Sequence, residues 1–400
     1  MRNGMSKGLT AAAAAMVLAA SLMGCQNGKP TAKEQARINW NSTRAAVQLN
    51  LAKQQYEAGA HAQCRKSLTQ ALSLDAKNVK IWILAAKLDI EESRLSEAAK
   101  SLEMAGGLDA KNAEVDYLMG IVQQRWQKLE AALEMYTAAS EKDPSELAYV
   151  LARAEMMVAL EQVPDAIALL QERLSVFANS SALRDALGQL LVQQGNYDEA
   201  VPMLRQAMLL SPEDQTIREH LALAQFYHKD FVGAGQNLER LVKDEKYKSR
   251  VDLITAYGEC LLQNGRPRDA RDQFDRAAEL DANSVAITLN LAKVSLQLND
   301  ARRAELAIRR ALALDAKHAE AHLMLGYLRL RQERLDDALA SFRRASTLDP
   351  DDVVSLCMAG FVFERQGRSA EAINCYTRAL KLRPKDELAT TLMAQIQPNE

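Results

Sequence analysis

The chain has 400 residues, of which 48% are hydrophobic but only 5% aromatic, and Ala and Leu carry most of the apolar weight. This bias favours helix over sheet. The 50 Lys and Arg nearly balance the 52 Asp and Glu, so no basic field is present of the kind that recruits nucleic acid. We therefore expect an all-helical protein that does not bind nucleic acid.

The first 24 residues have the pattern of a targeting segment. Arg2 and Lys7 precede an uncharged run from Leu9 to Leu22. That run is too short and too rich in Ala for a membrane span, which needs about 20 strongly apolar residues. Residues 1–24 are therefore not expected to belong to the folded part of the protein.

The run ends in Leu22-Met23-Gly24-Cys25, which resembles the bacterial lipobox. The resemblance implies that residues 1–24 are a lipoprotein signal peptide and that Cys25 is diacylated and becomes the mature N-terminus. Met23 departs from the small or β-branched residue more common there, and a plain secretory signal or an uncleaved anchor is the alternative. Gln26 in place of Asp implies, for a Gram-negative lipoprotein, export to the outer membrane, facing the periplasm.

Residues 25–44 form the next segment, which is polar and lacks a clear apolar period after Gly28 and Pro30. This composition predicts a tether between the lipid and the folded part.

One short phrase recurs from residue 74 onward at a spacing of 34 residues, as in Leu74-Asp75-Ala76-Lys77 and Leu314-Asp315-Ala316-Lys317. A fixed period of this length is the mark of a repeat fold. Stepping by 34, with two extra residues near Tyr247, places ten repeats within residues 45–386. They begin at Ala45, Val79, Ala113, Leu147, Ser181, Gln215, Val251, Val285, Ala319 and Val353.

Each unit resembles the tetratricopeptide repeat, a pair of antiparallel helices. The clearest copy has Gly360 at position 8, Ala372 at position 20, Tyr376 at position 24 and Pro384 at position 32. Small residues at positions 8 and 20 let two helices cross closely, and the large residue at position 24 fills the gap between them. The resemblance implies an all-α, right-handed superhelical solenoid of about ten helix-turn-helix repeats.

The pattern weakens at two places. Arg173 stands where Ala is usual, and the repeat that begins at Gln215 has Leu241 there plus the insertion. We expect a longer second helix or a looser turn over residues 241–250. Residues 387–400 are amphipathic at first and predict a C-terminal capping helix followed by a tail.

The resemblance also implies a concave groove lined by positions 2, 5, 9, 12 and 13 of each repeat. The partner-binding residues predicted from this mapping are apolar, aromatic or cationic: Tyr56, Ile83, Ile90, Tyr117, Ile121, Arg125, Phe226, Tyr227, Leu323, Tyr327, Arg331, Phe361 and Arg365. Aromatic side chains bury large area at low entropic cost, so we expect an apolar helix or extended segment of a partner there. Packing between repeats is the alternative role for any one of them.

The sequence offers no catalytic, cofactor or metal site. His318 and His322 have a metal-capable spacing but lack the order of zinc proteases, and we interpret them as solvated residues at a helix start. The cysteines beyond Cys25 lack C-x-x-C spacing, and pairing of Cys357 with Cys375 stays open. We expect no enzyme and no small-molecule substrate.

The predicted function is a protein-binding scaffold tethered to the bacterial envelope that assembles a multiprotein complex. By layout the chain resembles tetratricopeptide lipoproteins that help assemble type IV or Tad/Flp pili, although those are shorter. An accessory subunit of an outer-membrane assembly, proteolytic or polysaccharide-export system is the alternative, with catalysis in a partner chain. A third interpretation is a periplasmic binding module without lipid.

Overall fold

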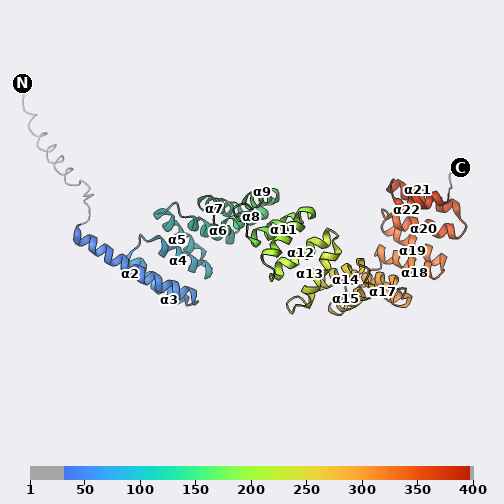
Figure 1. Cartoon of the computed structure of the whole chain (residues 1–400), viewed down its shortest axis with the longest axis horizontal. Coiled ribbons are helices and arrows are strands. Elements are labelled where there is room, and N and C mark those ends of the chain that lie inside the picture. The colour runs from blue at the N-terminus through green and yellow to red at the C-terminus, as the bar shows by residue number, and fades with distance from the viewer. Residues whose placement is uncertain (1–30, 397–400) are drawn as a thin grey trace, which may run out of the picture. The chain divides into compact units, whose positions relative to one another are not determined.

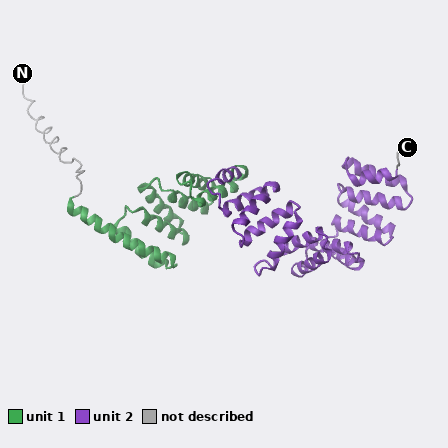
Figure 2. Ribbon diagram, viewed as in Figure 1, with its two compact units in different colours: residues 1–166 green, residues 167–400 purple. Residues whose placement is uncertain are grey.

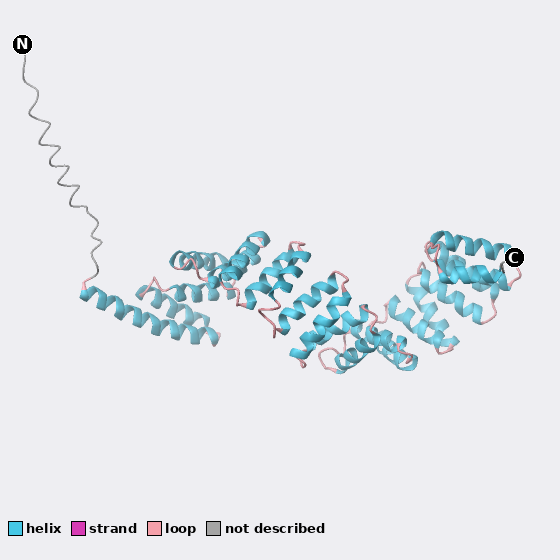
Figure 3. Ribbon diagram, turned by 45° about the horizontal axis from the view of Figure 1, so that its top comes forward, coloured by secondary structure: helices cyan, strands magenta, loops and turns pink. Residues whose placement is uncertain are grey.

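The computed structural model describes residues 31–396, and the part of the chain within those limits is entirely helical, without a strand (Figure 3). It holds 21 helices, numbered α2 to α22. The predicted all-α repeat fold is confirmed.

The helices follow one another along the chain with short turns between them (Figure 1). They are α2 (Ala32–Glu57), α3 (His61–Leu74), α4 (Val79–Glu91), α5 (Leu95–Leu108), α6 (Ala113–Arg125), α7 (Leu129–Lys142), α8 (Leu147–Ala159), α9 (Val163–Arg173), α10 (Ser181–Gln193), α11 (Tyr197–Leu210), α12 (Gln215–Tyr227), α13 (Phe231–Lys243), α14 (Val251–Gln263), α15 (Pro267–Leu280), α16 (Val285–Gln297), α17 (Ala301–Leu314), α18 (Ala319–Arg331), α19 (Leu335–Leu348), α20 (Val353–Arg365), α21 (Ser369–Leu382) and α22 (Glu387–Ile396).

The chain divides into two compact units, one up to Ala166 and one from Ile167 (Figure 2). In the first unit α2 packs on α3, α4 on α5 and α6 on α7. In the second unit the pairs run from α10 with α11 to α20 with α21. We call the first helix of each pair helix A and the second helix B.

Helix A begins at the predicted first residue in nine of the ten repeats, from Val79 in α4 to Val353 in α20. The first repeat differs. Helix α2 begins at Ala32 and not at Ala45, so the prediction of a polar tether is wrong for residues 32–44. Thr31 and Glu34 form a capping box there, and no Gly or Pro interrupts the helix before Gly59.

The two helices of a repeat cross where position 8 faces position 24. A Cβ on Gly258 would lie 2.6 Å from the Phe274 ring, and Gly120, Gly188, Gly326 and Gly360 meet the residue 16 positions on in the same way. Four of these five partners are aromatic, whereas repeats with Ala at position 8 have Leu or Ile at position 24, as in Ala86 with Leu102. Nine of the ten crossings are therefore filled by Gly with an aromatic residue or by Ala with Leu or Ile, and Gly188 with Leu204 is the exception.

Helix A ends in the same way in all ten repeats. Position 15 has a left-handed backbone, with φ between 58° and 75°, and only four of the ten residues are Gly. In the second repeat the Ser93 amide donates to Ile90 and the Arg94 amide donates to Asp89, the two hydrogen bonds of a Schellman turn. Six non-Gly residues thus accept a strained conformation so that helix B can turn back.

The recurring Asp of the sequence phrase has its own role in the turn after helix B. Asp75 Oδ1 accepts a hydrogen bond from the Lys77 amide at 3.1 Å, and Asp315 Oδ1 accepts one from the Lys317 amide at 2.9 Å. Such a carboxylate replaces a backbone acceptor and fixes the turn. The next helix A therefore begins at a constant place.

The expected irregularity between α13 and α14 is a looser turn, since α13 ends at Lys243 and does not lengthen. Tyr247 within this turn is buried against the second unit's core. Helix α9 is also short and ends at Arg173, the residue that replaces the usual Ala. At the C-terminal end, α22 packs on α20 and α21 and buries Ala389 and Leu392.

The predicted signal peptide over residues 1–24, the predicted lipid site Cys25 and the end of the predicted tail lie outside the described residues. Within the described range no helix is long and apolar enough to cross a membrane.

Candidate functional site: the helix A surfaces

A pocket of about 430 Å³ lies between two consecutive helices A of the second unit, α16 and α18. Its lining combines a polar rim with an apolar floor: Lys293, Leu296, Gln297, Glu320, Leu323, Met324, Tyr327 and Arg331. Three of these, Leu323, Tyr327 and Arg331, are predicted groove residues. We call this cavity the α16–α18 pocket.

An ion pair crosses the mouth of the pocket from one repeat to the next. Lys293 Nζ lies 3.6 Å from Glu320 Oε1, and both side chains are exposed. The same two positions are paired in the first unit, where Lys87 Nζ lies 2.6 Å from Glu114 Oε1. The glutamates were not among the predicted groove residues, although a Lys followed by a Glu 27 residues later was visible in the sequence.

Tyr327 is the large side chain at the base of the pocket. Its ring packs edge-on against Phe342, with 5.5 Å between the centroids. Burial raises the pKa of its hydroxyl above the usual range. Tyr327 therefore belongs partly to the crossing of its own repeat and partly to the pocket wall.

The predicted groove arginines tie neighbouring repeats together. Arg125 donates to the carbonyl of Ile90 at 2.6 Å, and Arg331 donates to the carbonyl of Leu296 and to Asn299 Oδ1. Both carbonyls lie in the last turn of the preceding helix A, where each also accepts a backbone hydrogen bond from the residue at position 15. Arg365 instead pairs with Glu333 at 2.8 Å.

The other predicted residues of the second unit form separate groups. Phe226 packs edge-on against Phe231, and the exposed ring of Tyr227 stacks on Tyr197 with 5.9 Å between centroids. Phe361 is half-buried on the C-terminal core. These aromatics remain partly accessible.

In the first unit the structure corrects two predicted residues. Ile83 and Ile90 are 5% and 6% exposed and belong to the core between the second and third repeats. These side chains pack in that core with Val115 and Leu118 of α6, so they are not available to a partner. Tyr117 and Ile121 are half-buried, and the Tyr117 ring lies 4.8 Å from that of Tyr149.

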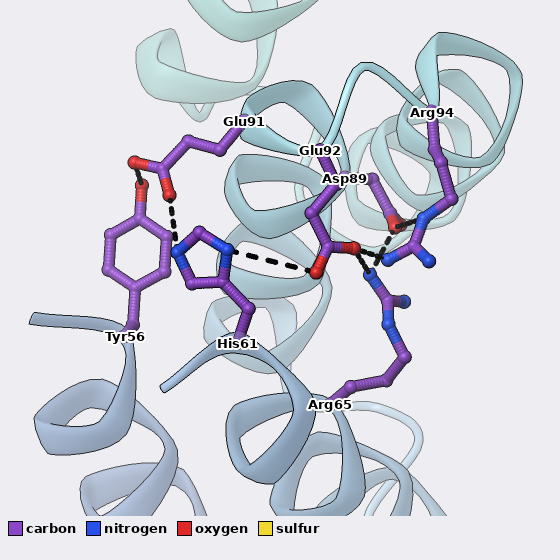
Figure 4. Close-up of polar contacts among 7 residues, drawn as sticks. All are labelled: Tyr56, His61, Arg65, Asp89, Glu91, Glu92 and Arg94. Atoms are coloured by element: carbon purple, nitrogen blue, oxygen red, sulfur yellow. Dashed lines mark hydrogen bonds and ion pairs between the residues drawn. The ribbon is translucent and has the colours of Figure 1, made fainter. Parts of the chain in front are cut away.

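Tyr56 belongs to a polar cluster that joins the first two repeats (Figure 4). Its hydroxyl donates to Glu91 Oε1 at 2.5 Å, and its ring stacks on His61. His61 Nε2 lies 3.3 Å from Glu91, while its Nδ1 lies 3.8 Å from Glu92. The hydroxyl of this predicted groove residue is therefore already engaged.

Asp89 anchors the other half of the cluster (Figure 4). Its Oδ1 accepts from Arg65 at 2.8 Å and from Arg94 at 3.1 Å, and both arginines also contact Glu92. Burial raises the pKa of the Asp89 carboxyl, although the charge of Arg65 opposes that shift. With its guanidinium partners in place, the cluster acts as a clip between repeats.

A half-buried pair links helices A of the fifth and sixth repeats. His220 Nδ1 lies 2.7 Å from Asp185 Oδ1. Burial alone would lower the pKa of His220, but the hydrogen bond and charge of Asp185, with smaller contributions from Glu219 and Asp214, raise it overall.

The described part of the chain provides no metal cluster and no activated thiol. No group of three or more His, Cys, Asp or Glu is placed to hold an ion between residues 31 and 396. Cys357 and Cys375 are both free thiols. Burial raises the pKa of Cys357 and of Cys260 to about 12, the opposite of what a nucleophilic thiolate needs.

Comparisons with known proteins agree with this arrangement. Family models described as tetratricopeptide repeat match residues 186–249, 255–301, 289–353 and 354–386. The DnaJ homolog subfamily C member 3 of Mus musculus is 23% identical over 188 residues, which is 43% of this chain and only 37% of that protein.

Two solved structures are similar to this chain, with TM-scores below 0.5. The crystal structure of MamA protein is 22% identical, covers 43% of this chain and 92% of its own, and has a TM-score of 0.37. The APC/C hetero-tetramer Cut9–Hcn1 is 13% identical, covers 89% of this chain and 90% of its own, and has a TM-score of 0.45. The family matches show that the chain contains tetratricopeptide repeats, in agreement with the nine helix pairs that pack together within repeats.

Proposed function

We propose that this protein is a non-catalytic scaffold, tethered to the bacterial envelope, that binds segments of partner proteins on its helix A surfaces. The α16–α18 pocket is the observation that carries the proposal. It combines the apolar floor of Leu323, Met324 and Tyr327 with the charged rim of Lys293 and Glu320. An apolar floor with a polar rim is how protein interfaces are built.

The expected occupant is an apolar side chain from a helix or extended segment of the partner. The pocket is as large as ordinary binding cavities, which are about 300 to 1,000 Å³. The backbone carbonyl of Leu296 is already bonded by Arg331, so the floor offers shape and apolar area more than hydrogen bonds. A partner helix therefore gains affinity mainly by burying apolar surface.

A photo-crosslinking residue in place of Gln297, which is exposed at the pocket, tests this in native envelopes. The matched control carries the same residue in place of Arg309, exposed on helix B α17. We expect a crosslinked partner from position 297 alone, lost on adding Leu323→Arg while the melting temperature is unchanged. Equal crosslinking from both positions, or none from 297, refutes the role of the pocket.

The lipid anchor is tested separately by incorporation of labelled fatty acid, which should disappear in a Cys25→Ser variant. Absence of label in the unmodified chain favours the lipid-free periplasmic module. The identity of the crosslinked partner then separates a pilus or secretion machine from outer-membrane assembly, proteolysis or polysaccharide export.

A further inference from the structure

The first helix of the first unit has an apolar face that nothing within the described residues covers. Helix α2 packs on α3 and α4, which follow it in the chain. Its residues Val47, Leu51 and Trp40 are 61%, 42% and 63% exposed and lie on one side of the helix, whereas the other exposed apolar residue of α2, Ile38, lies on the opposite side. We call these three side chains, with the cations around them, the α2 face.

Comparison with the other repeats shows how unusual this is. Val47 is position 3 of its repeat, and the residues at position 3 elsewhere, such as Ile81, Leu253 and Ile287, are buried against the preceding helix B. At the far end of the repeats, the matching residue of α22, Ala389, is also buried. Exposed apolar side chains of this size on one helix face mark an interaction surface.

Three cationic residues lie beside the apolar side chains of the α2 face. At about 100° per residue, Lys33, Arg37 and Arg44 lie within about 60° of Trp40 around the helix. The two acidic residues of α2, Glu34 and Glu57, lie about 100° or more away from it. None of the three cations forms an ion pair with another residue in the range 31–396.

We propose that the α2 face lies on the surface of an anionic phospholipid bilayer. A helix with aromatic and aliphatic residues on one side, flanked by Lys and Arg, binds such a surface with its axis in the interfacial plane. Trp is the side chain best suited to that depth. A second copy of the chain is a poorer occupant, because two such faces would bring six cations together.

The position of α2 in the chain agrees with this occupant. The inference rests in part on the proposed anchor at Cys25, from which Ala32 is seven residues away. Seven residues span at most about 25 Å, so a lipid at Cys25 keeps the start of α2 near the bilayer. The anchor and the α2 face would then be the two membrane signals that stable attachment requires.

The test is vesicle binding by residues 25–400 carrying Cys25→Ser, a chain that includes every described residue but has no lipid. It is sedimented with vesicles of equal parts phosphatidylglycerol and phosphatidylethanolamine, or with phosphatidylcholine vesicles. We expect binding to the anionic vesicles only. Arg37→Gln with Arg44→Gln should weaken it by about 25-fold, at about fivefold for each cation, and Trp40→Ala by about tenfold or more.

The matched controls remove similar groups elsewhere. Lys66→Gln with Lys100→Gln removes two exposed, unpaired cations from α3 and α5, and Leu306→Ala removes an exposed apolar side chain from α17. Both should leave binding within about twofold. All substituted side chains are exposed, so the variants should keep the parent's melting temperature.

The proposal would be overturned by no binding to anionic vesicles, by equal weakening by the control pair, or by a dimer in light scattering that Trp40→Ala abolishes. The last would assign the α2 face to a second copy. Capture of an acidic partner by the α2 face without vesicle binding would overturn it as well. Because the assay uses a chain without lipid, its failure is distinct from failure of fatty-acid labelling at Cys25.

Discussion

The pairing of position 8 with position 24 predicts that the effect of a Gly to Ala substitution at position 8 on stability depends on the residue at position 24. In the ninth repeat Gly326 lies against the Phe342 ring, and a Cβ there would clash with that ring. Replacing Gly by Ala within a helix gains about 1 kcal/mol of helix propensity, whereas overpacking a core costs about 1 to 3 kcal/mol. Gly326→Ala alone should therefore range from neutral to about 2 kcal/mol destabilising.

In a Phe342→Leu background the same substitution should stabilise the repeat by about 1 kcal/mol. The double variant has the Ala and Leu combination that four repeats already use, among them Ala86 with Leu102. The coupling energy between the two sites is then about 1 to 3 kcal/mol.

Hydrogen exchange of the α18 and α19 amides is the suitable assay, because it reports the stability of the repeat that carries the substitution. Gly107→Ala in α5 is the control, since a Cβ there meets no atom within 4 Å and only the propensity gain of up to about 1 kcal/mol remains. If Gly326→Ala has the same effect with Phe and with Leu at position 342, the matched-pair explanation is wrong.

Three further predictions concern the clip, the turns and the buried histidine. Asp89→Asn should cost about 1 to 3 kcal/mol in thermal unfolding, because two guanidiniums lose a shared carboxylate; unchanged melting would show that the clip is not stabilising. Lys229→Gly should stabilise the protein against urea by about 0.5 to 1 kcal/mol, because φ is 65° at this position. Gly195→Ala, at a position with φ of 72°, should destabilise it by a similar amount. A change of the same sign in both variants would contradict the strain assigned to these turns. The folded state raises the pKa of His220 above its unfolded value of about 6.5, so its contribution to stability is complete below that pH and is lost as pH rises through the folded pKa. Urea unfolding over a pH series should show this fall in the parent chain and not in His220→Gln, and parallel curves would exclude the pair as its source.

Much of the fold was predictable because the same residue types recur at the same positions of each repeat. Gly or Ala at position 8 and a large residue at position 24 predict the helix crossing, and nine first helices begin where the period places them. The start of α2 was not predictable from that period. Its extra turns depend on a single capping box at Thr31 and on the absence of helix breakers.

The site was less predictable, since the period places a residue on a helix but does not decide how close the neighbouring helix comes. Ile83 and Leu323 both occupy position 5, yet Ile83 is buried and Leu323 lines a pocket. The difference is in the neighbours: around Ile83 the helices close into a core with Trp82 and Tyr117, whereas the space between α16 and α18 stays open.

The positions that form the fold differ from the positions that are free to bind a partner. In every repeat positions 8 and 24 form the helix crossing and position 15 ends helix A, so these positions serve the fold and not a partner. Information resides where one repeat departs from its equivalents. Val47 is exposed at a position that is buried elsewhere, and Leu323 is accessible at a position where Ile83 is not. The α2 face and the α16–α18 pocket are two such departures, and they lie in different units. One protein can therefore meet a bilayer and a partner protein through separate surfaces, because each stacked repeat depends mainly on its immediate neighbours for stability.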